Sequence, residues 1–178
     1  RKYPKYQGGF IWDFVDQSIR WTGKNGKMIY AYAGDFNRMD DSGDKNFCNN
    51  GLISLTANQN PHAYEVQYFY QNIWTTPGDL AKGRNQGIQR KTSSVTWSAY
   101  ALEWEVLKDG KAIRSGRVEN LNVAPHQTAS VKLDLGKTCQ CGEWLLNVKY
   151  IQKNHEGLIP AGFVVAKDQL VLNPYKAP

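Results

Sequence analysis

The stretch LEWEVLKDGKAIRSGRV, residues 102–118, contains the pattern that decides the fold. Apolar residues alternate with glutamates from Leu102 to Val106, which is typical of a strand with one buried and one solvated face. Asp109–Gly110 is a strong hairpin-turn signal, and residues 111–118 return from it as a second strand. The stretch therefore predicts an antiparallel β-hairpin.

The sequence around this hairpin repeats the pattern. Residues 131–135 and 146–150 alternate between apolar and polar side chains, and residues 163–172 form a further apolar strand pattern. Turn signals separate these segments. About six or seven short antiparallel strands are typical of a β-sandwich of immunoglobulin-like type. We therefore predict such a sandwich over residues 75–178, in architecture only, because the Cys–Trp–Cys framework of antibody domains is absent.

Residues 1–74 have a different organisation. A short apolar stretch, Gly8–Val15, suits a buried strand end, and residues 35–50 are loop-like. Asn60–Pro61 is a helix-start signal, and apolar residues follow at helical spacing as far as Ile73. One strand, a long loop and one amphipathic helix cannot bury their apolar faces among themselves. We therefore expect this segment to be the end of a larger domain.

Composition excludes several classes of protein. The chain has 178 residues, 41% hydrophobic and 21% charged, which is not the composition of a disordered chain. Its net charge of +6 comes from scattered lysines and arginines, which predicts a solvated surface rather than a nucleic-acid stripe. The longest apolar run, Ala161–Ala166, is far too short to span a membrane. The chain lacks an initiating Met, which suggests a processed chain or a piece of a longer one.

Cysteine spacing predicts no disulfide framework. The three cysteines are Cys48, Cys139 and Cys141. The close pair is poorly placed for an internal bridge, because residues two apart on a strand are too distant. A zinc corner formed by this pair and His155 lacks a fourth ligand.

Few residues are candidates for chemistry. Asp13, Asp16 and Asp35 lie in the aromatic first segment, where they either form an acid–base pair or order the loop. Trp12 follows the Gly-Gly stretch, where its ring either packs in a core or stacks on a sugar. Asn50 belongs to an Asn-Asn-Gly turn whose amides suit a hard cation or a sugar hydroxyl. These alternatives stay open on spacing alone.

A family resemblance rests on these same residues. GGFIWDFVDQ, residues 8–17, closely resembles the Gly-Gly-Phe-Val/Ile-Trp-Asp-Trp/Phe-Val-Asp-Gln stretch of the large bacterial β-galactosidases of glycoside hydrolase family 2. Further matches follow in the same order: YAGDF at 32–36, FCNNGL at 47–52, the Pro61–His62 helix start with Ala63 in place of a second Pro, DGK at 109–111 and LNVAP at 121–125. The resemblance covers essentially the whole chain and is weakest at residues 83–97.

The resemblance implies a fold and an activity. Residues 1 to about 72 look like the last strand–loop–helix of a catalytic (β/α)8 barrel, and the rest looks like the fourth, immunoglobulin-like domain. Enzymes of this family hydrolyse terminal β-D-galactosides with retention, using two glutamates. Both glutamate motifs belong to barrel segments upstream of Arg1, so we expect no catalytic residue and no catalysis in this chain.

The resemblance also implies site residues and cofactors. Trp12 matches the tryptophan that lines the galactose pocket. Phe47, by its backbone carbonyl, and Asn50, by its side-chain amide, match residues that help to bind a sodium ion, and Asn50 also reaches the galactose. A further sodium ligand and the magnesium ligands lie upstream. We therefore expect a partial sodium site, and neither ion bound tightly by this chain alone.

Two alternatives to a β-galactosidase fragment remain. One is a stand-alone carbohydrate-binding sandwich, whose aromatic platform would come from Trp97, Trp104 or Trp144. The other is an interaction module. The expected partners of the fragment are β-galactosides and the remaining domains of a parent homo-oligomer, without nucleic acid or membrane. The sequence leaves linkage preference open, as well as a cytoplasmic or periplasmic location in a bacterium.

Overall fold

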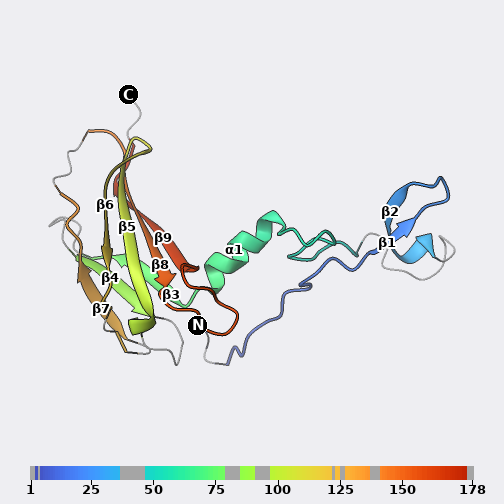
Figure 1. The fold of residues 1–178 in the computed structure, drawn as a ribbon, viewed down its shortest axis with the longest axis horizontal. Coiled ribbons are helices and arrows are strands. Elements are labelled where there is room, and N and C mark those ends of the chain that lie inside the picture. The colour runs from blue at the N-terminus through green and yellow to red at the C-terminus, as the bar shows by residue number, and fades with distance from the viewer. Residues whose placement is uncertain are drawn as a thin grey trace. The chain divides into compact units, whose positions relative to one another are not determined.

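A computed structural model divides the chain into two compact units, Arg1–Phe69 and Tyr70–Pro178 (Figure 1). The residues that it describes are 3, 5–36, 47–78, 85–90, 97–121, 123–124, 127–136 and 141–175, with the backbone only at 85–90. No helix among these residues combines the length and the apolar character that crossing a membrane requires.

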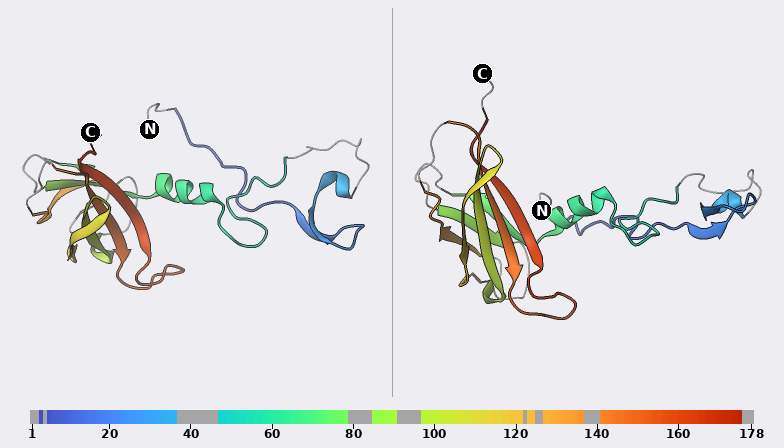
Figure 2. Two further views of the ribbon diagram at one scale, coloured as in Figure 1. Left: turned by 90° about the horizontal axis from the view of Figure 1, so that it is seen from above. Right: turned by 45° about the horizontal axis from the view of Figure 1, so that its top comes forward.

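The second unit is a sandwich of two antiparallel sheets, as the alternating pattern predicts. Figures 1 and 2 show the two sheets as separate layers, and the mainly β, immunoglobulin-like architecture is confirmed. One sheet has the order β3-β4-β7 and the other β6-β5-β8-β9. The strands are β3 (Ile73–Pro77), β4 (Asn85–Arg90), β5 (Tyr100–Lys108), β6 (Lys111–Val118), β7 (Thr128–Lys132), β8 (Trp144–Gln152) and β9 (Val164–Asn173). A 3-10 turn, η3 (Trp97–Ala99), precedes β5.

The predicted hairpin is the pair β5–β6. Leu102 lies opposite Val118 and Lys108 opposite Lys111. The turn residues Asp109 and Gly110 both have positive φ, 48° and 77°, as a two-residue hairpin turn of this kind requires. The apolar face of β5 is buried, and it joins a core whose largest fully buried side chains include Trp97 and Tyr150. The alternation in the sequence thus determines which face of the hairpin is buried.

A buried polar network links β3 to β8 and β9. The Asp168 carboxylate accepts hydrogen bonds from the Thr75 backbone N–H (2.7 Å) and from the Gln71 side-chain amide (3.3 Å). The Thr75 hydroxyl lies 2.9 Å from the Tyr150 hydroxyl. Gln71 Oε1 in turn accepts from the Lys167 backbone N–H (3.0 Å). Contacts with β8 and β9 therefore satisfy the polar atoms that Gln71 and Thr75 place in the interior.

Among its described residues, the first unit contains a small hairpin, a 3-10 turn and one helix. These are β1 (Ile19–Thr22), β2 (Met28–Ala31), η1 (Ala33–Asp35) and α1 (Pro61–Tyr70). The hairpin turns at Asn25–Gly26, where Gly26 has φ 75° and the Gly23 N–H donates to the Lys27 carbonyl (2.8 Å). Few apolar side chains are buried here, and Phe10, Trp12 and Phe14 are exposed.

The structure corrects three predictions. Gly8–Val15 forms no regular strand among the described residues; Val15 makes one isolated bridge to Ile53. The helix ends at Tyr70, and Ile73 lies in β3 with its side chain in the sandwich core, because core burial overrides the helical spacing of its sequence. Cys141 is disulfide-bonded although the spacing suggested no bridge, whereas Cys48 is free and buried.

Candidate functional site

Trp12 and Asn50, two of the predicted site residues, lie where residues 12–17 run beside residues 48–53. The Asp13 backbone N–H donates to the Asn50 carbonyl (3.3 Å), and the Leu52 N–H donates to the Asp13 carbonyl (3.0 Å). The Ile53 N–H continues this pairing with the Phe14 carbonyl (2.9 Å). Because Asp13 directly follows Trp12, these bonds bring Trp12 and Asn50 into the same small region. The peptide between Trp12 and Asp13 is cis.

Asn50 is unusual among the described residues. Both polar atoms of its side chain, Oδ1 and Nδ2, are buried and have no hydrogen-bond partner in the part of the chain that the structure describes. Leaving such atoms unsatisfied costs roughly 1–3 kcal/mol, so native structures usually pair them. An unpaired buried carboxamide has both a donor and an acceptor to offer a ligand.

Trp12 and Phe47 both have exposed side chains. Trp12 exposes 65% of its surface, so its ring is not a core residue of this unit. Phe47 exposes 57% and lines a hollow of about 290 Å³ with the β1–β2 hairpin and Cys48. Exposed aromatic rings and an unpaired buried amide are the groups that suit a sugar, whose C–H face packs on aromatics while its hydroxyls bond to amides.

The backbone of Gly51 is held from several sides. Its N–H donates to the Asp16 side chain (2.8 Å). Its carbonyl accepts from the Asn60 side-chain amide (2.8 Å) and lies 2.9 Å from His62 Nε2. Since a carbonyl only accepts, Nε2 of His62 carries the proton in this contact. Sequence reasoning placed His62 and Asn60 only at a helix start, and no local pattern reveals this contact across the loop.

The three aspartates have local structural partners. Asp13 accepts from the Gln17 side chain (2.7 Å) and from the Phe14 backbone N–H, and these hydrogen bonds hold the pKa of Asp13 below its ordinary value. Asp16 bonds to Gly51, and Asp35 accepts from the Tyr32 N–H (2.9 Å). These contacts favour the interpretation that the three carboxylates order the loops.

The described part of the chain contains no group of three or more His, Cys, Asp or Glu side chains that could hold a metal ion. Backbone carbonyl and carboxamide oxygens are nevertheless suitable ligands for hard cations. The buried, unpaired Oδ1 of Asn50 fits that requirement.

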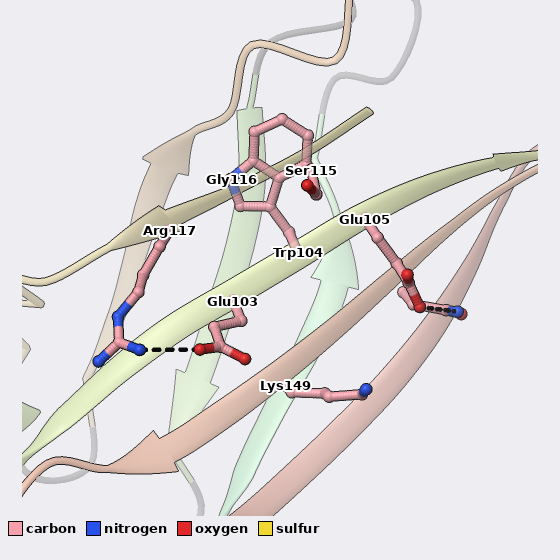
Figure 3. A pocket seen from close by; sticks show the side chains of 8 residues that line it. Glu103, Trp104, Glu105, Ser115, Gly116, Arg117 and Lys149 are labelled. Atoms are coloured by element: carbon pink, nitrogen blue, oxygen red, sulfur yellow. Dashed lines mark hydrogen bonds and ion pairs between the residues drawn. The ribbon is translucent and has the colours of Figure 1, made fainter. Parts of the chain in front are cut away.

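The sandwich has a separate hollow of about 360 Å³ on β5, β6 and β8. Four of its polar side chains pair with one another: Arg117 with Glu103 (2.8 Å), and Asn147 with Glu105 (3.0 Å) (Figure 3). Trp104, which points toward Gly116 in Figure 3, is only 9% exposed. Trp97 and Trp144 are also buried, so none of the three tryptophans offers the exposed ring that a stand-alone sugar-binding sandwich needs.

Comparison with known proteins divides the chain in two. Residues 1–75 match the family described as glycosyl hydrolases family 2, TIM barrel domain, and residues 88–173 match β-galactosidase, domain 4. The β-galactosidase of Priestia megaterium is 36% identical over 99% of this chain and 17% of its own length. The β-galactosidase of Clostridium acetobutylicum is 38% identical over 76% of this chain and 14% of its own length. The β-galactosidase of Pseudoalteromonas haloplanktis is 30% identical over 97% of this chain and 17% of its own length. The chain therefore spans about one sixth of the length of these relatives.

Proposed function

We propose that this chain, which belongs to the β-galactosidases of glycosyl hydrolase family 2, forms one wall of a galactose pocket and the sandwich domain that follows. The enzyme of which it forms part would hydrolyse terminal β-D-galactosides with retention. The observation that carries this proposal is the buried, unpaired carboxamide of Asn50, whose backbone carbonyl accepts from Asp13, the residue after the exposed Trp12. Each residue stands at the position that the family motif assigns to a sugar contact.

The two residues have complementary roles in this proposal. The Trp12 ring packs against the C–H face of the galactose, where aromatic surface contributes apolar contact and a fixed orientation. The Asn50 carboxamide bonds to a sugar hydroxyl, which pairs the atoms that this chain leaves unpaired. Together they orient the sugar without taking part in bond cleavage.

Sodium and magnesium are the ions proposed for the full-length enzyme. Oδ1 of Asn50 and the backbone carbonyl of Phe47 would hold a sodium ion, with a further ligand from outside this chain. A bound cation supplies positive charge that orients sugar hydroxyls and carboxamide oxygens around it. The magnesium ligands are proposed to lie outside this chain, and neither ion is expected to bind this chain tightly.

Retention requires two carboxyl groups about 5–5.5 Å apart on either side of the glycosidic bond. The carboxylates nearest to Trp12, on Asp13 and Asp16, are already hydrogen-bonded to neighbouring groups of the loops. We therefore propose that the chain supplies no catalytic residue and is inactive alone. The glutamates that carry out the chemistry are proposed to come from the rest of the enzyme.

The proposed domain division is residues 1–74, the end of the barrel, and residues 75–178, the sandwich. The two matched families, over residues 1–75 and 88–173, support this division. In the full-length enzyme the sandwich would buttress the barrel and connect it to the next domain. The proposed partners are β-galactosides, the remaining domains and further copies in a homo-oligomer.

The first experiment measures hydrolysis of a chromogenic β-D-galactoside by the purified 178-residue chain, with sodium and magnesium present. We expect no turnover, because the chain lacks the catalytic glutamates. Sustained turnover that is lost in Asp13→Asn or Asp35→Asn would overturn the proposal, since the acid–base pair would then lie in this chain.

The second experiment uses the full-length enzyme. Trp12→Ala and Asn50→Ala are each expected to lower kcat/KM by about tenfold to a hundredfold, because each removes a group that orients the sugar. Trp21→Ala, which removes another exposed tryptophan of the first unit, is the matched control and should have little effect. Equal activity of all three variants would contradict the proposed sugar contacts.

A further inference from the structure

We propose that Asp16 and His62 are positioning residues that aim the Asn50 carboxamide through the backbone of Gly51, an inference that rests on the proposed function. Neither side chain needs to touch the sugar or an ion for this role. Both bond to the backbone on the C-terminal side of Asn50. The sequence motifs assign no such role to either residue.

The peptide group that joins Asn50 to Gly51 is held at both of its edges. Its carbonyl, which belongs to Asn50, accepts from the Asp13 backbone N–H (3.3 Å). Its N–H, which belongs to Gly51, donates to Oδ1 of Asp16 (2.8 Å). With both edges bonded, this peptide plane cannot rotate without breaking a hydrogen bond, so the direction of the chain leaving Asn50 is determined.

The next peptide group is held in the same way. The Gly51 carbonyl accepts from the Asn60 side-chain amide (2.8 Å) and from His62 Nε2 (2.9 Å). The Leu52 N–H, on the opposite edge, donates to the Asp13 carbonyl (3.0 Å). Two consecutive peptide planes are therefore bonded on both edges by groups from two separate stretches of the first unit, residues 13–16 and 60–62.

Close packing leaves these planes little room to shift. A Cβ atom built on Gly51 would lie 2.2 Å from the Asp16 backbone nitrogen and 2.4 Å from the Val15 carbonyl carbon. The loop thus lies directly against the backbone of residues 15–16. Small displacements of this backbone are resisted both by contact and by the hydrogen bonds on either side.

The Asn50 side chain depends on this backbone for its orientation. No described residue bonds to its Oδ1 or Nδ2, so no side-chain partner determines where the carboxamide points. Its direction follows from the backbone at residues 50–51 and from packing. Loss of the Asp16 or His62 contact would let the backbone relax and would move the carboxamide away from its ligand.

The test is steady-state kinetics of the full-length enzyme with a chromogenic β-D-galactoside at a series of NaCl concentrations. His62→Ala and Asp16→Ala are expected to raise both KM and the half-saturating NaCl concentration by about tenfold, with a smaller change in kcat. His62→Gln retains a side-chain N–H donor and Asp16→Asn retains an oxygen acceptor, so both should recover most of the loss. His155→Ala, which removes an exposed histidine of the sandwich unit, is the matched control.

The outcomes separate this inference from the proposed function. If Asn50→Ala lowers activity but His62→Ala and Asp16→Ala leave KM and the NaCl dependence unchanged, the positioning role is wrong and the proposed sugar site stands. If Trp12→Ala and Asn50→Ala are also without effect, the proposed site itself fails. If an alanine variant does not fold, its conservative partner decides. Wild-type KM and NaCl dependence in folded His62→Gln and Asp16→Asn support the role, whereas a rise of about tenfold in KM and in the half-saturating NaCl concentration of these variants overturns it.

Discussion

Asn50 and Asp168 illustrate two states of a buried polar side chain. Asp168 accepts from Thr75 and Gln71 inside the sandwich, so its charge is compensated by local donors. The Asn50 carboxamide is buried without such bonds in the described part of the chain. The first pattern stabilises a fold. The second leaves hydrogen-bonding capacity that only a ligand or another part of an enzyme would use.

The buried Tyr150 makes the free energy of unfolding depend on pH. Burial raises the pKa of its phenol above the ordinary value of 10.0; the Thr75 hydrogen bond opposes this shift, and the negative charge of Asp168 adds to it. Because the folded-state pKa is raised, the stability contribution is complete below pH 10.0 and is lost as the pH rises above it. We expect the free energy of unfolding of the full chain to fall above that pH.

The measurement is urea unfolding of the full chain between neutral and alkaline pH. Tyr150→Phe should lower the neutral-pH free energy of unfolding by about 1 kcal/mol, through loss of the Thr75 hydrogen bond, and should flatten the alkaline decline. Tyr175→Phe, at an exposed position, should leave the decline unchanged. An identical alkaline slope in Tyr150→Phe and wild type would rule out this linkage.

At the scale of elements, Trp104 of β5 leaves no room for a side chain at Gly116 of the edge strand β6. Trp104 lies opposite Gly116 in the hairpin register, and its indole covers the glycine. A Cβ atom on Gly116 would lie 2.5 Å from the indole ring. The missing side chain therefore makes the room in which a large core residue packs.

Gly116→Val tests this packing. We expect it to lower the free energy of unfolding by about 1–3 kcal/mol, because the added methyl groups displace the Trp104 ring. Ser115→Ala, on the neighbouring exposed position of β6, should change stability by less than about 0.5 kcal/mol. Thermal unfolding followed by tryptophan fluorescence measures both. A Gly116→Val variant as stable as Ser115→Ala would show that the ring is not confined.

At the scale of the whole molecule, the two units differ in how much they bury. The hydrophobic core cluster lies entirely between Ile73 and Leu170, within the second unit. The first unit exposes large apolar side chains, including Phe10, Trp12 and Phe14. A unit with so little buried apolar surface gains little stability of its own.

We therefore expect residues 70–178, expressed alone, to unfold cooperatively and to be more soluble than the full chain. This truncation retains Gln71 and the Asp168 network and removes the exposed aromatics. Circular dichroism during heating and the concentration at which each protein precipitates are the measurements. Loss of cooperative unfolding in the truncated chain would show that the sandwich needs the first unit to fold.

Local patterns in the sequence determined the sandwich, its hairpin and the family. Alternation in β5 predicted which side chains are buried, Asp109–Gly110 predicted the turn, and the motif around Trp12 identified the relatives. Alternation and turn propensity act over a few residues, so they can be read directly from the order of amino acids. The helical interpretation of Ile73 failed because core packing overrides local spacing. The predicted strand at Gly8–Val15 failed differently: its large apolar side chains are exposed, and among the described residues it makes one isolated bridge, from Val15 to Ile53.

Only the tertiary structure decided which distant groups meet. The approach of residues 12–17 to residues 48–53, and the convergence of Asp16, Asn60 and His62 on Gly51, join stretches that are not adjacent in sequence. The burial of Asn50 without a partner follows from the same approach. Such contacts depend on the path of the backbone, which no short pattern encodes. The sequence therefore indicated which residues are candidates for a sugar site, and the fold decided what holds them in place.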